Sequence, residues 1–218
     1  MSESISSQKI GPFGFDHHCV VSSVGRSGGL WMLWEDDIDI EIITQSPNMI
    51  HALVRNDGPR NSWHLFYIYG PPITNQGASF WSSLTSYVSN FDGCKSFIGD
   101  FNAIVSVQEK FGGLPVLDSN ISAFDDFIHQ NHLSDLGFSI PAYTWSNDRA
   151  FQGIIRKRLD RIMANPEWCI SYHSPVVLHL PRISSDHAHI LLNTSRRIAR
   201  VPPNYKFEAY WISHPEFL

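Results

Sequence analysis

The stretch KSFIGDFN, residues 95–102, joins a short apolar run to an acid and an amide. Lys95–Ile98 predicts a strand, and Asp100 and Asn102 follow at its carboxyl end, two residues apart and therefore on the same face. Side chains of this kind can bind a phosphate or a metal. Asp and Asn also end strands as ordinary turn formers, so the stretch alone leaves both interpretations open.

Short runs rich in β-branched and aromatic residues recur around this stretch. The run IDIEIIT, residues 38–44, alternates apolar and polar residues, which is typical of a strand with one solvated face. Residues 80–91 and 121–128 have helical period instead, and Asn120 is the predicted cap of the second helix. We therefore expect an α/β fold of two packed sheets with helices outside them. Further strands are expected at 18–24, 29–34, 49–55 and 63–69, and in RLDRIMA and HAHILLN.

Length and composition predict one sizeable domain, since 43% of the 218 residues are hydrophobic and 17% are charged. The net charge of −5 argues against binding nucleic acid through bulk positive charge. It does not exclude a nuclease, because a metal site needs acidic groups. Three cysteines at wide spacing indicate neither a disulfide framework nor a zinc site. This cysteine pattern favours an intracellular, reducing compartment. We expect a soluble protein without a membrane partner, since stretches such as GGLWMLW are too short to cross a bilayer.

The chain divides into three expected segments. Residues 1–14 form a Ser-rich start that we expect to be frayed, and residues 15–194 form the domain. Residues 195–218 are a basic linker or tail with a double proline. Its local basic patch consists of Arg196, Arg197, Arg200 and Lys206.

Three further motifs carry groups suited to chemistry. In SSDH, Asp186 beside His187 suits a metal ligand next to a general base, because histidine titrates near neutral pH; an ordinary polar loop is the alternative. In RLDR, Asp160 can orient that histidine, or it can lie in a solvated, salt-bridged strand with Arg158 and Arg161. Tyr69 ends the strand WHLFYIY, where its hydroxyl can reach a phosphate or simply stay in water.

The order of these motifs is more specific than any one of them. Tyr-x-Pro after a strand, then GDFN, then Thr144-Trp145, then RLD, then SDH resembles the motif series of the endonuclease/exonuclease/phosphatase superfamily, the DNase I-like proteins. The contexts GDFNAIVSVQEKFGG, RLDRIMANPEW and HLPRISSDHAHILL are most similar to the apurinic-endonuclease-like domain of plant LINE-type, non-LTR retrotransposons. The tail FEAYWISHPEF resembles the connector that leads toward the reverse transcriptase of those polyproteins.

This resemblance implies a four-layer α/β/β/α sandwich of two mostly antiparallel sheets. It also implies hydrolysis of a phosphodiester with Mg²⁺, or with Mn²⁺, on double-stranded DNA. The family suggests the nucleus as the compartment, although the sequence shows no targeting signal, and a monomer is the state that we favour. His187 resembles the general base of this family, and Asp160 resembles its orienting partner. Asp100 matches the acid that assists the leaving oxygen or positions the water.

The same resemblance assigns the phosphate and metal contacts. Asn102 and Tyr69 match the phosphate-binding amide and tyrosine of the family. Asp186 matches the carboxylate near the metal, and the metal set we expect is Asp186, Asp100 and Asn102. DNA contacts are expected from the loop between two site motifs, through Arg149, Arg156 and Lys157.

The sequence departs from the family at its start. Family members begin with a strand, a helix and a second strand that ends in the principal metal-binding glutamate, and MSESISSQKIGPFGF does not resemble that unit. We therefore expect a domain incomplete at its N-terminus and an endonuclease activity that is weak or lost. The alternatives are a non-catalytic, transposon-derived remnant or binding module, and a phosphatase that acts on a small phosphorylated substrate.

Overall fold

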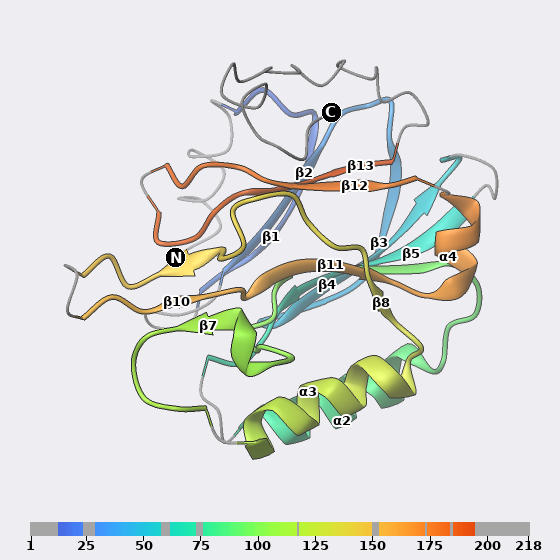
Figure 1. The fold of residues 1–218 in the computed structure, drawn as a ribbon. Coiled ribbons are helices and arrows are strands. Elements are labelled where there is room, and N and C mark those ends of the chain that lie inside the picture. Colours follow the sequence, from blue (N-terminus) through green and yellow to red (C-terminus); the bar gives the residue numbers. More distant parts are fainter. Residues whose placement is uncertain are drawn as a thin grey trace, which may run out of the picture.

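The computed structural model of this chain describes residues 13–23, 29–57, 62–72, 76–116, 118–149, 153–172, 174–183 and 185–194. Its largest element is a six-stranded sheet with the strand order β3-β4-β5-β6-β11-β8. Figure 1 shows helices α2 and α3 on one side of this sheet, and two two-stranded sheets, β1-β2 and β12-β13, on the other. The six strands are β3 (Asp39–Ser46), β4 (Met49–Arg55), β5 (Ser62–Tyr69), β6 (Lys95–Asp100), β11 (Asp160–Ala164) and β8 (Ser134–Asp135).

The remaining strands form small sheets. A three-stranded sheet has the order β7-β10-β9 and carries part of the segment between the TW and RLD motifs. The small-sheet strands are β1 (His17–Val21), β2 (Leu30–Trp34), β7 (Lys110–Phe111), β9 (Trp145–Ser146), β10 (Arg156–Lys157), β12 (Val176–His179) and β13 (Ile190–Asn193).

Strand β3 has the alternation that its sequence predicts. From Asp39 to Ser46 its residues are exposed and half-buried in turn, and Ile40 and Ile42 pack against the core cluster shared with β1 and β2. Since β3 pairs only with β4 within the described sheet, it is an edge strand. Its acidic residues Asp39 and Glu41 lie on the solvated face, which opposes pairing with another chain.

Helix α2 (Gly77–Val88) makes the parallel pairing of β5 and β6 possible. The other neighbours in the six-stranded sheet are antiparallel, whereas β5 and β6 run in the same direction and need a crossover. Helix α2 supplies that crossover and buries Trp81, Leu84 and Val88, the predicted apolar stripe. The crossover brings the carboxyl ends of β5 and β6 to the same end of the sheet.

Helix α3 (Asp118–Gln130) packs beside α2 and completes this helical layer. Phe124 and Phe127 are almost completely buried against Trp81. Removing one of these rings by substitution with alanine would cost about 3 to 5 kcal/mol of unfolding free energy. The predicted Asn120 cap is wrong, because the helix begins at Asp118 and residue 120 lies inside it.

The short helix α4 (Pro166–Ser171) follows β11. The Asn165 side chain accepts a hydrogen bond from the Trp168 backbone N–H, and Pro166 stands at the first helical position. Trp168 is fully buried against Trp63 and Tyr172. The Asn165 cap and Pro166 thus define the start of this helix, and Trp168 anchors it to the core.

The predicted fold class, a layered α/β arrangement with helices outside packed sheets, is confirmed. Most of the expected N-terminal segment 1–14, and all of the tail 195–218 with its basic patch, lie outside the described residues. Within the described part of the chain, no helix is long and apolar enough to cross a membrane.

Candidate active site

Strands β5, β6 and β11 bring three of the predicted residues into one row. Tyr69 is the register partner of Asp100 across the parallel pair, and Asp160 is the partner of Asp100 across the antiparallel pair. Partners on neighbouring strands share one face of a sheet. The row therefore lies on the face opposite α2 and α3, at the end of the sheet where β5 and β6 terminate.

His187 joins this row from the loop between β12 and β13. Its Nδ1 atom lies 2.9 Å from Oδ2 of Asp160, and its Nε2 atom lies 3.9 Å from Oδ2 of Asp100. One ligand atom each from Asp100, Asp160 and His187 falls within 4.8 Å of the other two. The structure thus brings together an imidazole and two carboxylates whose motifs are separated by 27 to 87 positions in the sequence.

The TW motif holds the other two motifs in place. The buried Thr144 hydroxyl oxygen accepts hydrogen bonds from the backbone N–H groups of Leu159 and Asp160, at 2.9 and 3.0 Å. The Thr144 backbone carbonyl accepts a hydrogen bond from the Ala188 N–H, and Trp145 forms a β-bridge with His187. Thr144 therefore fixes the RLD and SDH segments relative to each other, which is why a small β-branched hydroxyl residue suits this position.

Charge repulsion characterises the carboxylate pair. Burial first, and then the Asp160 charge, raise the pKa of Asp100 to about 6, while His187 and the Asn102 backbone N–H act in the opposite direction. The pKa of His187 is raised: burial alone would lower it, but the hydrogen bond to Asp160 and the neighbouring carboxylates outweigh burial. The imidazole is therefore oriented and made more basic by Asp160.

Asn102 follows β6 in the left-handed region, with φ of 49°. Its backbone N–H donates to Oδ1 of Asp100 at 2.8 Å, and its side-chain amide donates to the Gly70 carbonyl at 2.9 Å. Gly70 has to be glycine, because a Cβ atom there would lie 2.1 Å from the Phe101 carbonyl oxygen. The sequence Tyr69-Gly70-Pro71 is thus a close-approach site that couples β5 to the GDFN loop.

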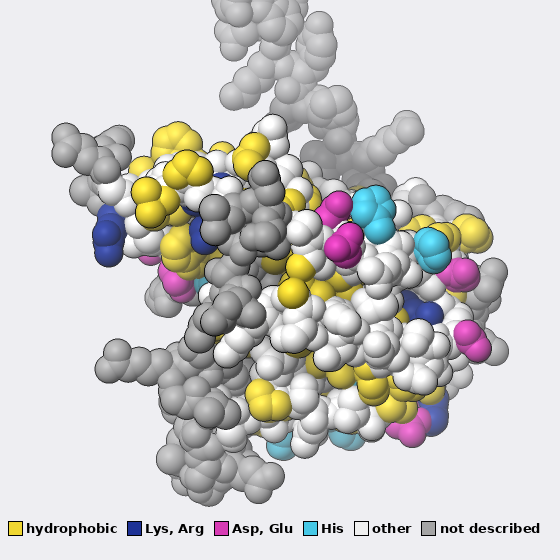
Figure 2. Space-filling model, turned by 90° about the horizontal axis from the view of Figure 1, so that it is seen from below, with side chains coloured by type: hydrophobic (Ala, Val, Ile, Leu, Met, Phe, Trp, Pro, Cys, Tyr) yellow, Lys and Arg dark blue, Asp and Glu magenta, His cyan; other side chains and the backbone are white. Residues whose placement is uncertain are grey.

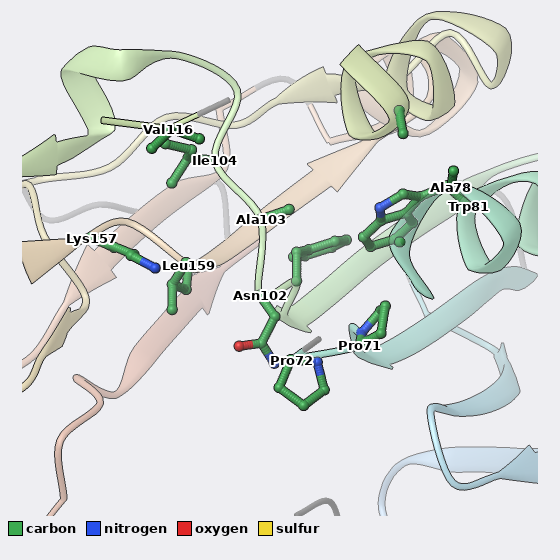
Figure 3. Close-up of a pocket in the computed structure, with 13 residues that line it drawn as sticks. Pro71, Pro72, Ala78, Trp81, Asn102, Ala103, Ile104, Val116, Lys157 and Leu159 are labelled. Atoms are coloured by element: carbon green, nitrogen blue, oxygen red, sulfur yellow. The ribbon is translucent and has the colours of Figure 1, made fainter. Parts of the chain in front are cut away.

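A cavity of about 140 Å³ opens beside Asn102. Figure 3 shows Pro71, Pro72 and Trp81 on one side of Asn102 and Lys157 and Leu159 on the other. The oxygen of the Asn102 side chain points toward the part of the lining formed by Lys157 and Leu159 (Figure 3). The cavity combines an apolar lining with one amide and one cation, and none of Asp100, Asp160 and His187 lines it.

Asp186 occupies a different position from the other predicted metal ligands. It is exposed, its Oδ2 atom accepts a hydrogen bond from the Trp145 indole N–H at 2.9 Å, and it lies outside the group of three. Lys157 Nζ lies 5.6 Å from the centre of the Trp145 ring. Of the predicted DNA contacts, Arg149 and Arg156 are exposed and Lys157 is half-buried.

Two features of the site were not predicted. Tyr67 lies two residues before Tyr69 on the same strand face, and its pKa is raised by burial and then by the charges of Asp160 and Asp100. The period of two in SWHLFYIY was the signal that could have identified it.

In addition, Arg158 and Arg161 are not part of a solvated salt-bridged strand, which was one of the two interpretations of RLDR. Both are buried, in an ion-pair network with Glu109 and Asp135.

The donors present fit a hard divalent cation. Asp100 and Asp160 offer carboxylate oxygens, which Mg²⁺ prefers, and Mg²⁺ sites in proteins commonly use one or two carboxylates together with water and substrate phosphate. Burial and then the Asp160 charge raise the pKa of Asp100, and a cation beside these groups would oppose both effects. No glutamate belongs to the cluster within the described residues.

Comparison with solved structures places this layered arrangement in the endonuclease/exonuclease/phosphatase, or DNase I-like, fold. No protein-family model and no curated protein matches the sequence. The endonuclease domain of TRAS1, a telomere-specific non-LTR retrotransposon, is 15% identical with a TM-score of 0.63, over 87% of this chain and 89% of that one.

Two further structures have the same fold. The 3′ phosphatase NExo from Neisseria, bound to a product DNA hairpin, is 15% identical with a TM-score of 0.62, over 88% of this chain and 84% of that one. TDP2 from D. rerio, complexed with a single-strand DNA product, is 13% identical with a TM-score of 0.52, over 85% of this chain and 80% of that one. At these identities the likeness establishes the fold and confirms the expected superfamily architecture.

Proposed function

We propose that this chain is a metal-assisted phosphodiesterase domain of nuclease type that acts on DNA. The observation that carries the proposal is the hydrogen-bonded pair of His187 and Asp160 next to Asp100, built on strand ends of a DNase I-like fold. Such a pair can take a proton from water and hold the resulting imidazolium. The likeness to the TRAS1 endonuclease domain and to NExo supports DNA as the substrate class, and the ordered motifs support a LINE origin.

In the proposed reaction His187 is the general base. Its Nδ1 atom is held by Asp160, so Nε2 is the atom free to take a proton from the attacking water. Asp100 assists the leaving oxygen or positions the water. Asn102 and Tyr69 contact the phosphate in this proposal. Tyr69 lies beside Asp100 on the neighbouring strand, and the Asn102 amide is bonded to the carbonyl of Gly70, the residue that follows Tyr69. Asp100, with Asn102 and Asp186, would hold Mg²⁺ or Mn²⁺, and the cation when bound would stabilise the charge on the phosphoryl oxygens.

DNA would approach the strand-end side of the domain rather than the helical side. Helix α2 contains no charged residue, and Figure 2, which shows the helical side, has a mainly uncharged surface. The exposed Arg156 lies on β10, the exposed Arg149 lies between β9 and β10, and Lys157 lines the cavity at Asn102. Replacing these three residues by alanine is expected to weaken duplex binding and to lower the slope of log K against log salt by about 0.9 for each phosphate that is no longer neutralised.

The matched control for that experiment is Arg55→Ala. Arg55 is an exposed cation at the register position of Ser62, at the opposite end of β5 from Tyr69. Its loss should leave the salt slope unchanged. An unchanged slope in the triple variant would contradict the assignment of Arg149, Arg156 and Lys157.

We also propose that the activity of this chain is weak. The described cluster supplies two carboxylates and one imidazole, and the imidazole is already paired with Asp160. Asp160 is committed to its hydrogen bond with His187, which leaves Asp100 as the one carboxylate of the cluster for the cation, and such a site is expected to hold Mg²⁺ loosely. Cleavage is therefore expected to be detectable when the enzyme is stoichiometric with the DNA, and not when each enzyme molecule would have to cleave many DNA molecules.

The test is nicking of supercoiled plasmid in Mg²⁺, in Mn²⁺ and in chelator, at stoichiometric and at catalytic enzyme. The expected result is metal-dependent nicking at stoichiometric enzyme that Asp160→Asn reduces strongly. Rapid nicking at catalytic enzyme would contradict weak activity. Salt-dependent DNA binding without any nicking would instead favour the non-catalytic binding module. Release of phosphate from a small phosphomonoester, without action on plasmid, would favour the phosphatase.

A further inference from the structure

A buried ion-pair network lies on the face of β11 opposite Asp160. Arg161 is fully buried, and its guanidinium donates to both carboxylate oxygens of Glu109 at 2.7 and 3.1 Å. Arg158 donates to Glu109 at 3.0 Å, and both arginines donate to Asp135, at 2.7 and 3.0 Å. Two cations and two anions thus balance, with Arg158, Arg161 and Glu109 largely shielded from water and Asp135 partly exposed. The fixed fork of each guanidinium defines where each carboxylate must lie.

Glu109 connects this network to the loop that carries Asn102. Its Oε2 atom accepts a hydrogen bond from the Val105 backbone N–H at 2.8 Å, and its backbone carbonyl accepts from the Arg158 N–H at 3.0 Å. Arg161 also donates to the Ala103 carbonyl at 3.4 Å. The segment 103–109 is therefore anchored to β11 through Glu109 and Arg161.

The position of Asn102 depends on both ends of its short loop. On the β6 side, its N–H is held by Asp100, and the Phe101 N–H donates to the Leu159 carbonyl. On the other side, the chain leaves its left-handed conformation at Asn102 and passes directly into the segment anchored by Glu109. Asp160 and Arg161 are neighbours on β11, so the strand that presents Asp160 to His187 also presents Arg161 to Glu109.

We propose that Glu109 is a positioning residue, which acts through the buried arginines to fix Asn102 relative to the row of Asp100 and Asp160. This inference rests on the proposed phosphodiesterase function for its catalytic consequence. Glu109 itself touches no reacting group. Its role is to hold the GDFN loop so that the Asn102 amide meets the phosphate without reorganisation.

The experiment compares Glu109→Gln with Asp135→Asn. Both substitutions are nearly isosteric and remove one anion from the same network, so both are expected to lower overall stability. Only Glu109 also binds the Val105 N–H of the GDFN loop. Amide hydrogen exchange should be measured for residues 101–109, with each variant corrected for its global stability by urea unfolding. In Glu109→Gln we expect exchange at Asn102 and Val105 to accelerate at least tenfold, with no comparable change in Asp135→Asn.

Cleavage kinetics supply the second readout. Glu109→Gln should lower kcat at least tenfold with KM changed less than about twofold, whereas Asp135→Asn should leave kcat within about threefold of the wild type. Equal effects of both variants on loop exchange and on kcat would reduce Glu109 to a purely structural residue and overturn the proposal. If the wild type does not cleave DNA, the proposed function fails, and hydrogen exchange still tests the positioning role.

A conservative variant covers the case in which Glu109→Gln does not fold. Glu109→Asp keeps the negative charge among the arginines but withdraws the carboxylate from Val105 by one methylene. The same acceleration of exchange at Asn102 and Val105 is expected. Exchange as slow as in the wild type would refute the proposal.

Discussion

Replacing Asp100 with asparagine should stabilise the folded protein at pH 8 while abolishing hydrolysis. The pKa of Asp100 is raised by burial and by Asp160 from 3.8 to about 6, so between these pH values the folded state binds more protons than the unfolded state. The contribution to stability is fully present below pH 3.8 and is lost as the pH rises through about 6. Each pH unit of that difference corresponds to about 1.4 kcal/mol, so ionised Asp100 lowers the unfolding free energy by up to about 3 kcal/mol.

Asparagine at this position cannot ionise and retains an oxygen to accept the Asn102 N–H. Urea unfolding in chelator, followed by tryptophan fluorescence, should therefore show a gain of about 2 to 3 kcal/mol at pH 8 that shrinks to about 1 kcal/mol at pH 4.5. Asp126→Asn, at an exposed position of α3, is the control and should change stability by less than about 0.5 kcal/mol.

A loss of stability in Asp100→Asn at pH 8, or a gain equal at both pH values, would refute this reasoning. Either result would mean that burial and the Asp160 charge do not raise the pKa of Asp100 in the folded state. The case for a cation site at this row would then lose its electrostatic support.

Three other perturbations follow from the same structure. Burial and then His64 lower the pKa of His51 to about 4, so this side chain stays neutral in the folded state where it would be protonated in the unfolded chain. Between pH 7 and 4.5 the unfolding free energy of the wild type should therefore fall by about 2 to 3 kcal/mol more than that of His51→Gln. Parallel pH profiles of the two proteins in urea unfolding would contradict this. Asp160→Asn should lower the pKa of His187 in an NMR titration, and an unchanged pKa would mean that the hydrogen bond contributes nothing. Gly70→Ala should destabilise the protein by about 2 kcal/mol or more in thermal unfolding, because the new Cβ atom would meet the Phe101 carbonyl. Gly77→Ala is the control and should be nearly neutral, because its Cβ atom would contact Trp81 at an ordinary distance.

Much of the site geometry was predictable because it depends on strand ends. Asp100 and Asn102 follow an apolar run with a clear period, and the helical stripe of α2 indicated a helix between β5 and β6. The ordered motifs then related Asp160 and His187 to Asp100, although no local pattern relates positions 27 residues apart. The period of two and the order of the motifs can be identified in the sequence without any information on tertiary packing.

The parts that were not predictable depend on tertiary burial. Arginines on a strand are usually solvated, so Arg158 and Arg161 gave no sign that Glu109 and Asp135 would bind them in the interior. Likewise the Trp145 indole N–H reaches Asp186, 41 positions away, and no spacing rule links the two. The error at Asn120 has a local cause, since helix α3 extends one turn further toward its N-terminus than its apolar stripe.

The central claim is that His187, held by Asp160 beside Asp100, is the general base of a phosphodiester hydrolase. Single-turnover cleavage of a fluorescently labelled DNA duplex, with excess enzyme and Mg²⁺, tests it most directly. His189→Ala is the matched control, because His189 is an exposed histidine two residues further along the same segment. Cleavage by the wild type and His189→Ala that is lost in His187→Ala is the predicted result. Cleavage that persists at the wild-type rate in His187→Ala would contradict the claim.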